Sequence, residues 1–257
     1  MTQSRPHPRL SILGVSAGPR DASTSALVRA ALIGATEVEG VEPRMVSLAG
    51  KHVEPCNGCT PCLEAGACVI DDDMTPLYPL LLDADAIVVG TPVYFGTVSG
   101  ACKAFMERVE GLGIAEKRLR LKVGGAIATG ASRNGGQENA LATLHLWFHI
   151  NDMVPIGITS PVTQWGVAGH TGHGVDDILD DVIPLKMSGR EMRSLEAAWL
   201  YGRKIATVTR IIDEGRRSTG LDLPDLEPYG FNDSVVPEGL APVLEGRALA
   251  SFEDSTQ

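Results

Sequence analysis

Long apolar runs are missing from this 257-residue chain. Its most apolar segments are strand-length, far short of the roughly 20 residues that a bilayer-spanning helix needs. The first ten residues, MTQSRPHPRL, lack the apolar stretch of a secretory signal. Basic residues are scarce too: 22 Lys and Arg stand against 32 Asp and Glu, for a formal net charge of -10, and such a field repels nucleic acids. We therefore expect a cytoplasmic globular protein with no membrane and no nucleic acid as partner.

Cysteine is infrequent and unevenly placed. Of five cysteines, four lie between Cys56 and Cys68, and Cys102 stands alone. A cytosolic chain of this length buries enough core to fold without disulfides. A dense cysteine group in such a chain is typical of metal or redox chemistry, whereas Cys102, on a predicted helix, is expected to be a small buried residue.

Short apolar runs alternate with segments of helical periodicity. Continuous runs such as Ala86–Gly90 suit parallel strands that are buried on both faces. We expect five strands, at Leu10–Val15, Arg44–Leu48, Ala86–Gly90, Val123–Ala128 and Val154–Ile158. The spacing of apolar residues predicts helices at Ala26–Ile33, after Asp72, across Val98–Val109, around Leu141–Phe148 and over Glu191–Ile212. This alternation indicates an α/β fold with a doubly wound, five-stranded parallel sheet of order 2-1-3-4-5.

Two segments depart from this alternation. A cysteine-rich, turn-rich insertion, residues 55–69, follows the second predicted strand. After about residue 215 the chain becomes rich in Pro, Gly and acidic residues, as in LDLPDLEPYGFNDSVVPEGLAP. We expect one domain over residues 1–215 and an irregular C-terminal arm or tail over residues 216–257.

Three loops follow the first, third and fourth predicted strands, at the sheet edge where such folds bind ligands. Gly14–Ser25 combines glycines, hydroxyls and a helix start, which suits a phosphate, although an ordinary capped turn has the same composition. Gly90–Gly100 pairs Tyr94 with Phe95 among Gly and Pro, as expected of a wall for a flat flavin ring. The alternative is that both aromatics belong to the core. Thr129–Glu138 is polar and glycine-rich, and suits the remaining edge of such a ring.

These loops carry a family resemblance. GVSAGPRDASTSALV, DDDMTPLYPLLLDADAIVVGTPVYFGTVSGACKAFMERV and ASRNGGQENA strongly resemble the NADPH-dependent FMN reductase family, over roughly Leu10–Ile158. The resemblance implies a flavodoxin-like fold that binds FMN, NAD(P)H as a candidate electron donor, and a homodimer or homotetramer. It places around the FMN phosphate Ser16, Arg20, Ser23, Thr24 and Ser25. It places along the isoalloxazine Pro92, Val93, Tyr94, Phe95, Gly96 and Thr97, and completes the pocket with Thr129, Gly130, Gly135 and Gly136.

The cysteine segment has the spacing C-x2-C-x2-C-x5-C, formed by Cys56, Cys59, Cys62 and Cys68. Two-residue gaps let successive thiolates converge on one centre, and iron–sulfur clusters are held by such runs. Zinc, which also takes four thiolates, is the chemical alternative, and a motif that holds no metal is another. The segment resembles the compact cysteine motif of the iron–sulfur flavoproteins, a branch of the same superfamily, which implies a 4Fe-4S cluster on these four residues.

Two histidine pairs are weaker signals. His170 and His173 lie in a Gly/His-rich stretch that we interpret as a flap over the flavin, since no carboxylate cluster has the spacing of a metal site. His145 and His149, four apart on a predicted helix, are expected to face solvent or a subunit contact.

The predicted function is that of an FMN-dependent oxidoreductase and iron–sulfur flavoprotein. It would pass electrons between a reduced donor and an acceptor through FMN and the cluster, and the flavin rather than a side chain would carry the chemistry. Its partner would be a small molecule or a ferredoxin-like redox protein. The alternatives are a cluster-free NAD(P)H-dependent FMN or quinone reductase, a flavodoxin-like electron carrier, and a zinc-stapled binding module.

Overall fold

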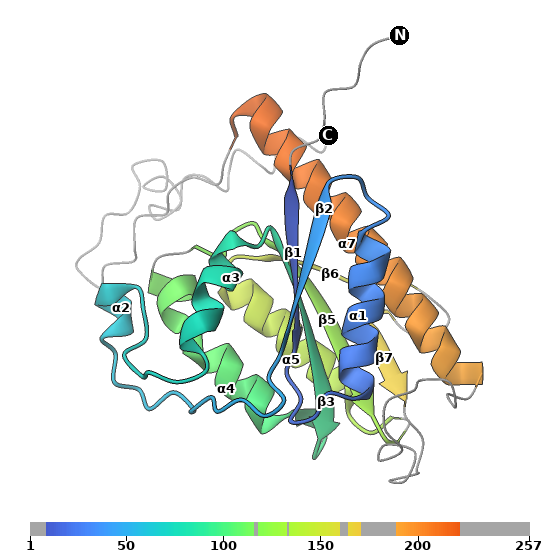
Figure 1. Ribbon diagram of the computed structural model, residues 1–257, viewed down its shortest axis with the longest axis horizontal. Coiled ribbons are helices and arrows are strands. Elements are labelled where there is room, and N and C mark those ends of the chain that lie inside the picture. The colour runs from blue at the N-terminus through green and yellow to red at the C-terminus, as the bar shows by residue number, and fades with distance from the viewer. Residues whose placement is uncertain (1–8, 116–117, 133, 160–163, 171–188, 222–257) are drawn as a thin grey trace, which may run out of the picture. The chain divides into compact units, whose positions relative to one another are not determined.

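The computed structural model describes residues 9–115, 118–132, 134–159, 164–170 and 189–221. All of them lie within one compact unit, Met1–Leu221. They form three layers, with helices on both faces of a largely parallel β-sheet (Figure 1). Within these described residues, no helix is long and apolar enough to cross a membrane.

Across the described residues the sheet has seven strands: β1 (Leu10–Ser16), β2 (Val41–Ser47), β3 (Ala86–Tyr94), β4 (Thr97–Val98), β5 (Val123–Gly130), β6 (Val154–Ile156) and β7 (Val167–His170). Its main path is β2-β1-β3-β5-β6, which is the predicted order 2-1-3-4-5 once the two-residue β4 is set aside. The fold class is thus confirmed, but the predicted count of five strands is too low. The two extra strands are β4, which turns back antiparallel on the end of β3, and β7, which pairs with β5.

The strand β5 changes partner along its length. Gly125 pairs with Ile156 of β6, whereas Ile127 pairs with Val167 of β7. Two short strands therefore share the last position of the sheet. Because β7 falls in the Gly/His-rich stretch, this part of the predicted flap is sheet, and His173 lies outside the described residues.

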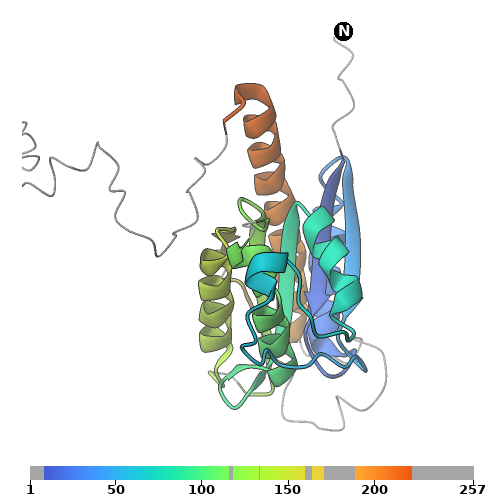
Figure 2. The ribbon, with the colours of Figure 1, turned by 90° about the vertical axis from the view of Figure 1, so that its left-hand side faces the viewer.

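Helices cover both faces of the sheet. One face carries α1 (Ser23–Ala35) and α7 (Gly189–Thr219), and the other carries α3 (Tyr78–Asp83), α4 (Gly100–Arg108) and α5 (Gln137–Ile150) (Figures 1 and 2). Shorter helical turns are α2 (Cys62–Ala65), the 3-10 turn η1 (Thr75–Leu77) and the π-turn η2 (Gly111–Ala115).

Side chains of the central strands alternate between two cores. In β1, Ile12 packs with residues of α1 and α7, whereas its neighbour Leu13 packs with residues of α3, α4 and α5. Every residue of β1 and β5 is buried, as expected of strands covered on both faces. Glycine lets the helices come close, because a Cβ on Gly124 would lie 2.6 Å from the Phe148 ring of α5.

Two predicted boundaries shift. Val98, predicted as the first apolar position of a helix, lies in β4, and α4 starts after Ser99, whose hydroxyl accepts the N–H of Cys102 at 3.1 Å. Cys102 is buried, as predicted. At the other end, α7 continues through Thr219, beyond the boundary placed at residue 215. Residues 222–257, most of the predicted tail, lie outside the described residues.

Candidate functional site

The carboxyl ends of β1, β3 and β5 meet at one edge of the sheet, and the loops after them line a pocket of about 270 Å³. All three predicted loops contribute, and the predicted FMN contacts that line the pocket are Arg20, Ser23, Thr24, Pro92, Val93, Tyr94, Thr129 and Gly130. The remaining lining residues are Gly18, Pro19, Ala22 and Ala131. The parallel sheet thus brings together three segments that are far apart in the sequence.

Ser16 and Ser25 do not line this pocket. Both are fully buried, and their hydroxyl oxygens lie 2.8 Å apart. The bond joins the last residue of β1 to the first turn of α1. The two serines therefore shape the first loop from within rather than face the pocket.

The first turn of α1 opens into the pocket. Among the described residues, no side chain caps this helix at its N-cap, Ala22, and backbone N–H groups at a helix start favour an anion. Asp21 is paired with Arg29 at 2.7 Å. Hydrogen bonds from Ser25 and Arg29 lower the pKa of Asp21. The carboxylate in this loop is therefore paired, while Arg20 is exposed at the pocket wall.

Buried hydroxyl groups tie the three loops to one another. The Oγ1 atoms of Thr24 and Thr129 lie 2.6 Å apart, which joins the first loop to the loop after β5. The hydroxyl of Ser99 donates to the carbonyl of Ala17 at 2.7 Å, and the N–H of Ser99 donates to Thr91 Oγ1 at 3.1 Å. Hydrogen bonds thus hold the three pocket loops together, and Ser99 is a part of this network that the sequence did not single out.

The loop after β3 has an unusual backbone. Phe95 (φ +48°) and Gly96 (φ +84°) both adopt left-handed conformations, which is costly for a phenylalanine. Phe95 is fully exposed and Tyr94 is 39% exposed. The alternative that both aromatics belong to the core is therefore wrong.

The loops after β3 and β5 meet at backbone distance. A Cβ on Gly136, where φ is +115°, would lie 2.5 Å from the Cα of Gly96. Asn139 Nδ2 donates to the carbonyl of Gly96 at 2.9 Å. The predicted FMN contacts that do not line the pocket in this region are Phe95, Gly96, Thr97, Gly135 and Gly136.

The cysteine segment lies against the end of α4 and the η2 turn. The N–H of Cys56 donates to Glu107 Oε2 at 3.3 Å. A Cβ on Gly111 would lie 3.0 Å from the Cβ of Cys62, so the two backbones are closely packed. All the thiols are free; Cys62 is buried, Cys59 is exposed, and the other two of the segment are half-buried.

The four cysteine sulfurs lie near one another but are not arranged as a metal site. Burial raises the pKa of the Cys62 thiol, and negative charge on Glu110 and on the other three cysteines raises it further. In the part of the chain that the structure describes, no three His, Cys, Asp or Glu side chains are arranged to hold a metal. The donor set itself fits such a group chemically, because four free thiols with these gaps suit an iron–sulfur cluster or zinc. A metal on these cysteines stays a prediction.

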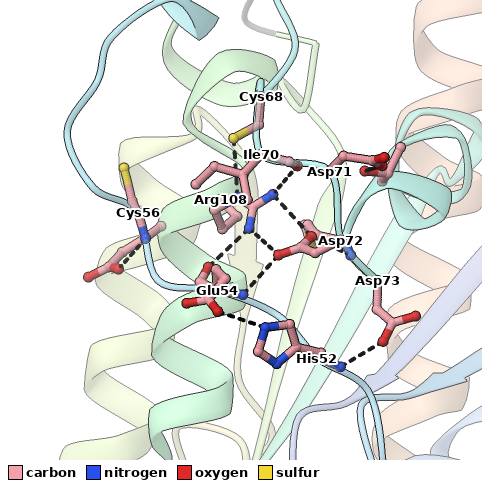
Figure 3. Close-up of polar contacts among 12 residues, drawn as sticks. His52, Glu54, Cys56, Cys68, Ile70, Asp71, Asp72, Asp73 and Arg108 are labelled. Carbon is pink, nitrogen blue, oxygen red and sulfur yellow. Dashed lines mark hydrogen bonds and ion pairs between the residues drawn. The ribbon is translucent and has the colours of Figure 1, made fainter.

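A buried arginine holds the cysteine segment in place (Figure 3). The side chain of Arg108, the last residue of α4, is 0% exposed. It donates twice to Asp72, at 2.6 and 3.1 Å, once to the carbonyl of Glu54 at 3.0 Å and once to that of Ile70 at 2.9 Å. Its Nε donates to Cys68 Sγ at 3.2 Å. Nothing in the sequence singles out Arg108, because a basic residue at the end of a helix ordinarily faces solvent near the helix dipole.

The sequence suggests only that Asp72 precedes a helix, but in the structure its carboxylate has further partners. Its Oδ1 accepts the N–H of Met74 at 2.9 Å, and its Oδ2 accepts the N–H of Glu54 at 2.8 Å. Burial by itself would raise the pKa of Asp72, but the hydrogen bonds from Arg108, Glu54 and Met74 lower it below its usual value. Asp72 is therefore a charged partner that joins the residues before and after the cysteine segment to Arg108 of α4.

Comparison with known proteins agrees with this geometry. Residues 10–166, more than half of the chain, match the NADPH-dependent FMN reductase family. The chain therefore belongs to that family and is an FMN-dependent oxidoreductase.

Individual relatives add detail. The chain is 40% identical over 204 residues to an iron-sulfur flavoprotein of Methanocaldococcus jannaschii, covering 79% of this chain and 99% of the relative. It is 29% identical over 140 residues to an NAD(P)H dehydrogenase (quinone) of Paracoccus denitrificans, covering 48% and 67%. A flavodoxin, a WrbA-like protein from Agrobacterium tumefaciens, superposes with a TM-score of 0.54 at 20% identity, covering 79% of this chain and 98% of that chain. The last likeness shows the flavodoxin-like fold.

Proposed function

We propose that this chain is an iron–sulfur flavoprotein, which passes electrons between a reduced donor and an acceptor by way of FMN and a cluster. The observation that carries the proposal is the position of the two candidate sites at opposite ends of α4. Ser99, at the start of α4, is bonded to the first pocket loop, and Arg108, at its end, is bonded to the cysteine segment. A nine-residue helix is roughly 14 Å long. The 40% identical iron-sulfur flavoprotein supports the same reading.

The protein's part in this function is to bind and to orient. FMN supplies two-electron acceptance and one-electron release, and an iron–sulfur cluster supplies one-electron transfer. The first turn of α1 and Arg20 would hold the phosphate, and Pro92, Val93 and Tyr94 would border the ring. The proposed cluster ligands are Cys56, Cys59, Cys62 and Cys68.

Anaerobic purification tests the proposal. The protein should release FMN on denaturation and should hold about four irons and four sulfides per chain. Cys59→Ala should abolish or convert the cluster and leave FMN in place, because the flavin loops are separate segments. Cys102→Ala, a change in the core away from the segment, is the matched control and should leave the iron content unaltered. Stoichiometric zinc, or no metal after anaerobic reconstitution, would overturn the cluster.

The second candidate is a cluster-free NAD(P)H-dependent FMN or quinone reductase. Two observations favour it: no three described His, Cys, Asp or Glu side chains are arranged to hold a metal ion, and one relative is an NAD(P)H dehydrogenase (quinone). Iron-free protein that oxidises NADH or NADPH with a quinone would support this reading. Iron-free protein with bound FMN and no such activity would point to a flavodoxin-like carrier instead.

We also propose a homodimer or homotetramer, in the cytoplasm, with a small-molecule or ferredoxin-like redox partner. Support for self-association comes from α5, where Leu146 and Ile150, four residues apart, are 64% and 63% exposed. Exposed apolar side chains on one helix face suit a contact with another chain. Light scattering of the full-length protein measures the assembly, and a monomer at all concentrations would contradict the proposal.

A further inference from the structure

All five N–H donors of the Arg108 guanidinium are used, one on Cys68 of the cysteine segment and four on residues that flank the segment (Figure 3). Four of them go to oxygen atoms: the two of the Asp72 carboxylate and the carbonyls of Glu54 and Ile70. Because these four bonds fix the planar group, the fifth donor, Nε–H, is held toward Cys68 Sγ at 3.2 Å.

The partner of Nε–H is the unusual feature. A thiol sulfur is a weak acceptor, whereas a buried guanidinium normally donates its hydrogen bonds to carboxylates and carbonyls. A sulfur that carries negative charge, as a thiolate or a cluster ligand does, is a much better partner for a charged donor. The side chains of Arg108 and Asp72 are 0% and 4% exposed and form an ion pair. Because their two charges compensate each other, what Arg108 contributes at Cys68 is the directed hydrogen bond from Nε–H.

We propose that Arg108 is the positioning residue of the cluster site. It holds Cys68 in place for ligation from outside the cysteine segment, and its Nε–H raises the reduction potential of the cluster. The physical reason is that a hydrogen bond to a ligand sulfur stabilises the reduced state, which carries more negative charge, over the oxidised state. This inference rests on the proposed function, since it takes Cys68 as a ligand.

Two variants test it, each designed to avoid an unpaired buried charge. Arg108→Lys keeps a positive charge beside Asp72, but one ammonium cannot also serve Cys68 and the two carbonyls. The double variant Arg108→Met with Asp72→Asn removes both charges together. The control is Arg44→Gln, which alters a more exposed arginine that pairs with Asp83 at 2.8 Å.

The readouts are iron per chain, bound FMN, the unfolding temperature, and the reduction potentials of cluster and flavin measured separately. We expect the cluster potential to shift to more negative values in both variants, while the flavin potential and the control stay unchanged. Loss of iron from both variants, with FMN and the unfolding temperature retained, would also support the positioning role. Full iron with an unchanged cluster potential in both would overturn the inference alone.

Two further outcomes are decisive. Wild-type protein that takes up no iron would overturn this inference together with the proposed cluster. If both variants fail to fold, pulsed EPR on the reduced wild-type protein with isotope-labelled arginine decides. A coupling between the cluster spin and an arginine nitrogen supports the inference, and the lack of any such coupling overturns it.

Discussion

The hydroxyl of Tyr201 accepts the backbone N–H of Ala126 at 3.1 Å, at the point where β5 exchanges β6 for β7. The same hydroxyl donates to the carbonyl of Ile156, the last residue of β6. A side chain from α7 thereby satisfies backbone groups that a continuous neighbouring strand would otherwise pair. Burial raises the pKa of Tyr201, which keeps the hydroxyl protonated as a donor.

Tyr201→Phe should therefore destabilise the fold. It leaves the buried N–H of Ala126 and the partly buried carbonyl of Ile156 without this partner, and an unsatisfied buried polar group costs about 1–3 kcal/mol. Urea unfolding followed by circular dichroism measures the change. Tyr94→Phe, at a 39% exposed position, is the control and should be close to neutral. Equal stability of the two variants would contradict the role of the Tyr201 hydroxyl.

Arg20→Ala should weaken FMN binding. Arg20 lies on the wall of the pocket beside the start of α1, and loss of a charge-assisted contact costs about 1.5–3 kcal/mol. The affinity should fall by roughly 10- to 150-fold, measured by titrating flavin-free protein with FMN and following flavin fluorescence. Arg44→Ala, at a surface pair away from the pocket loops, should bind FMN normally. Protein that never takes up FMN would rule out the flavin site altogether.

Gly136→Ala should disturb the pocket by forcing apart the backbones of two of its loops. The residue has φ +115°, and a Cβ would lie 2.5 Å from the Cα of Gly96, so the loops after β3 and β5 must move apart. We expect faster FMN release and a lower unfolding temperature. Gly100→Ala is the matched control, because a Cβ there meets nothing within 4 Å and alanine favours a helix by about 0.5–1 kcal/mol. Identical behaviour of the two variants would show that the close approach is unimportant.

Acid should remove the contribution of Asp72 to stability. Hydrogen bonds from Arg108 and two backbone N–H groups outweigh burial and hold the pKa of Asp72 below 3.8. A carboxyl group whose pKa is lower in the folded state stabilises the fold above its unfolded pKa. This contribution disappears as the pH falls through the folded pKa.

The measurement is the free energy of unfolding of wild type minus that of Asp72→Asn. At pH 7 the difference should be about 3–5 kcal/mol, since the variant leaves Arg108 buried without its charged partner. It should stay constant down to about pH 5 and shrink below about pH 4. Asp83→Asn, at a 51% exposed side chain, serves as the control. A difference that is unchanged at pH 2 would mean that Asp72 does not titrate as the structure implies.

The sequence by itself determined the class of the fold and which three loops line the candidate pocket. Apolar runs such as Ala86–Gly90 and Val123–Ala128 are strong local signals, because a strand covered on both faces has few polar positions. Once the strands are parallel, their carboxyl ends must share one edge. The three loops therefore meet, although nothing local in any one of them requires it.

Only the tertiary structure decided how each loop is used. Ser16 and Ser25 carry the hydroxyls expected of a phosphate site, yet they bond to each other in the interior. Phe95 is exposed in a left-handed conformation rather than packed. These outcomes depend on neighbours that are distant in the sequence, which residue type and spacing do not specify.

The cysteine segment, too, could be predicted from the sequence only in part. The spacing of its thiols is local and can be read directly, so the donor set was evident from the sequence. What holds the segment is a buried pair between Arg108 and Asp72, 36 residues apart, together with a bond from Arg108 to Cys68, 40 residues away. An arginine at a helix end and an aspartate before a turn are ordinary surface residues in a sequence. Only the packing of the segment against α4 buries both side chains, and each buried charge then needs the other as its partner.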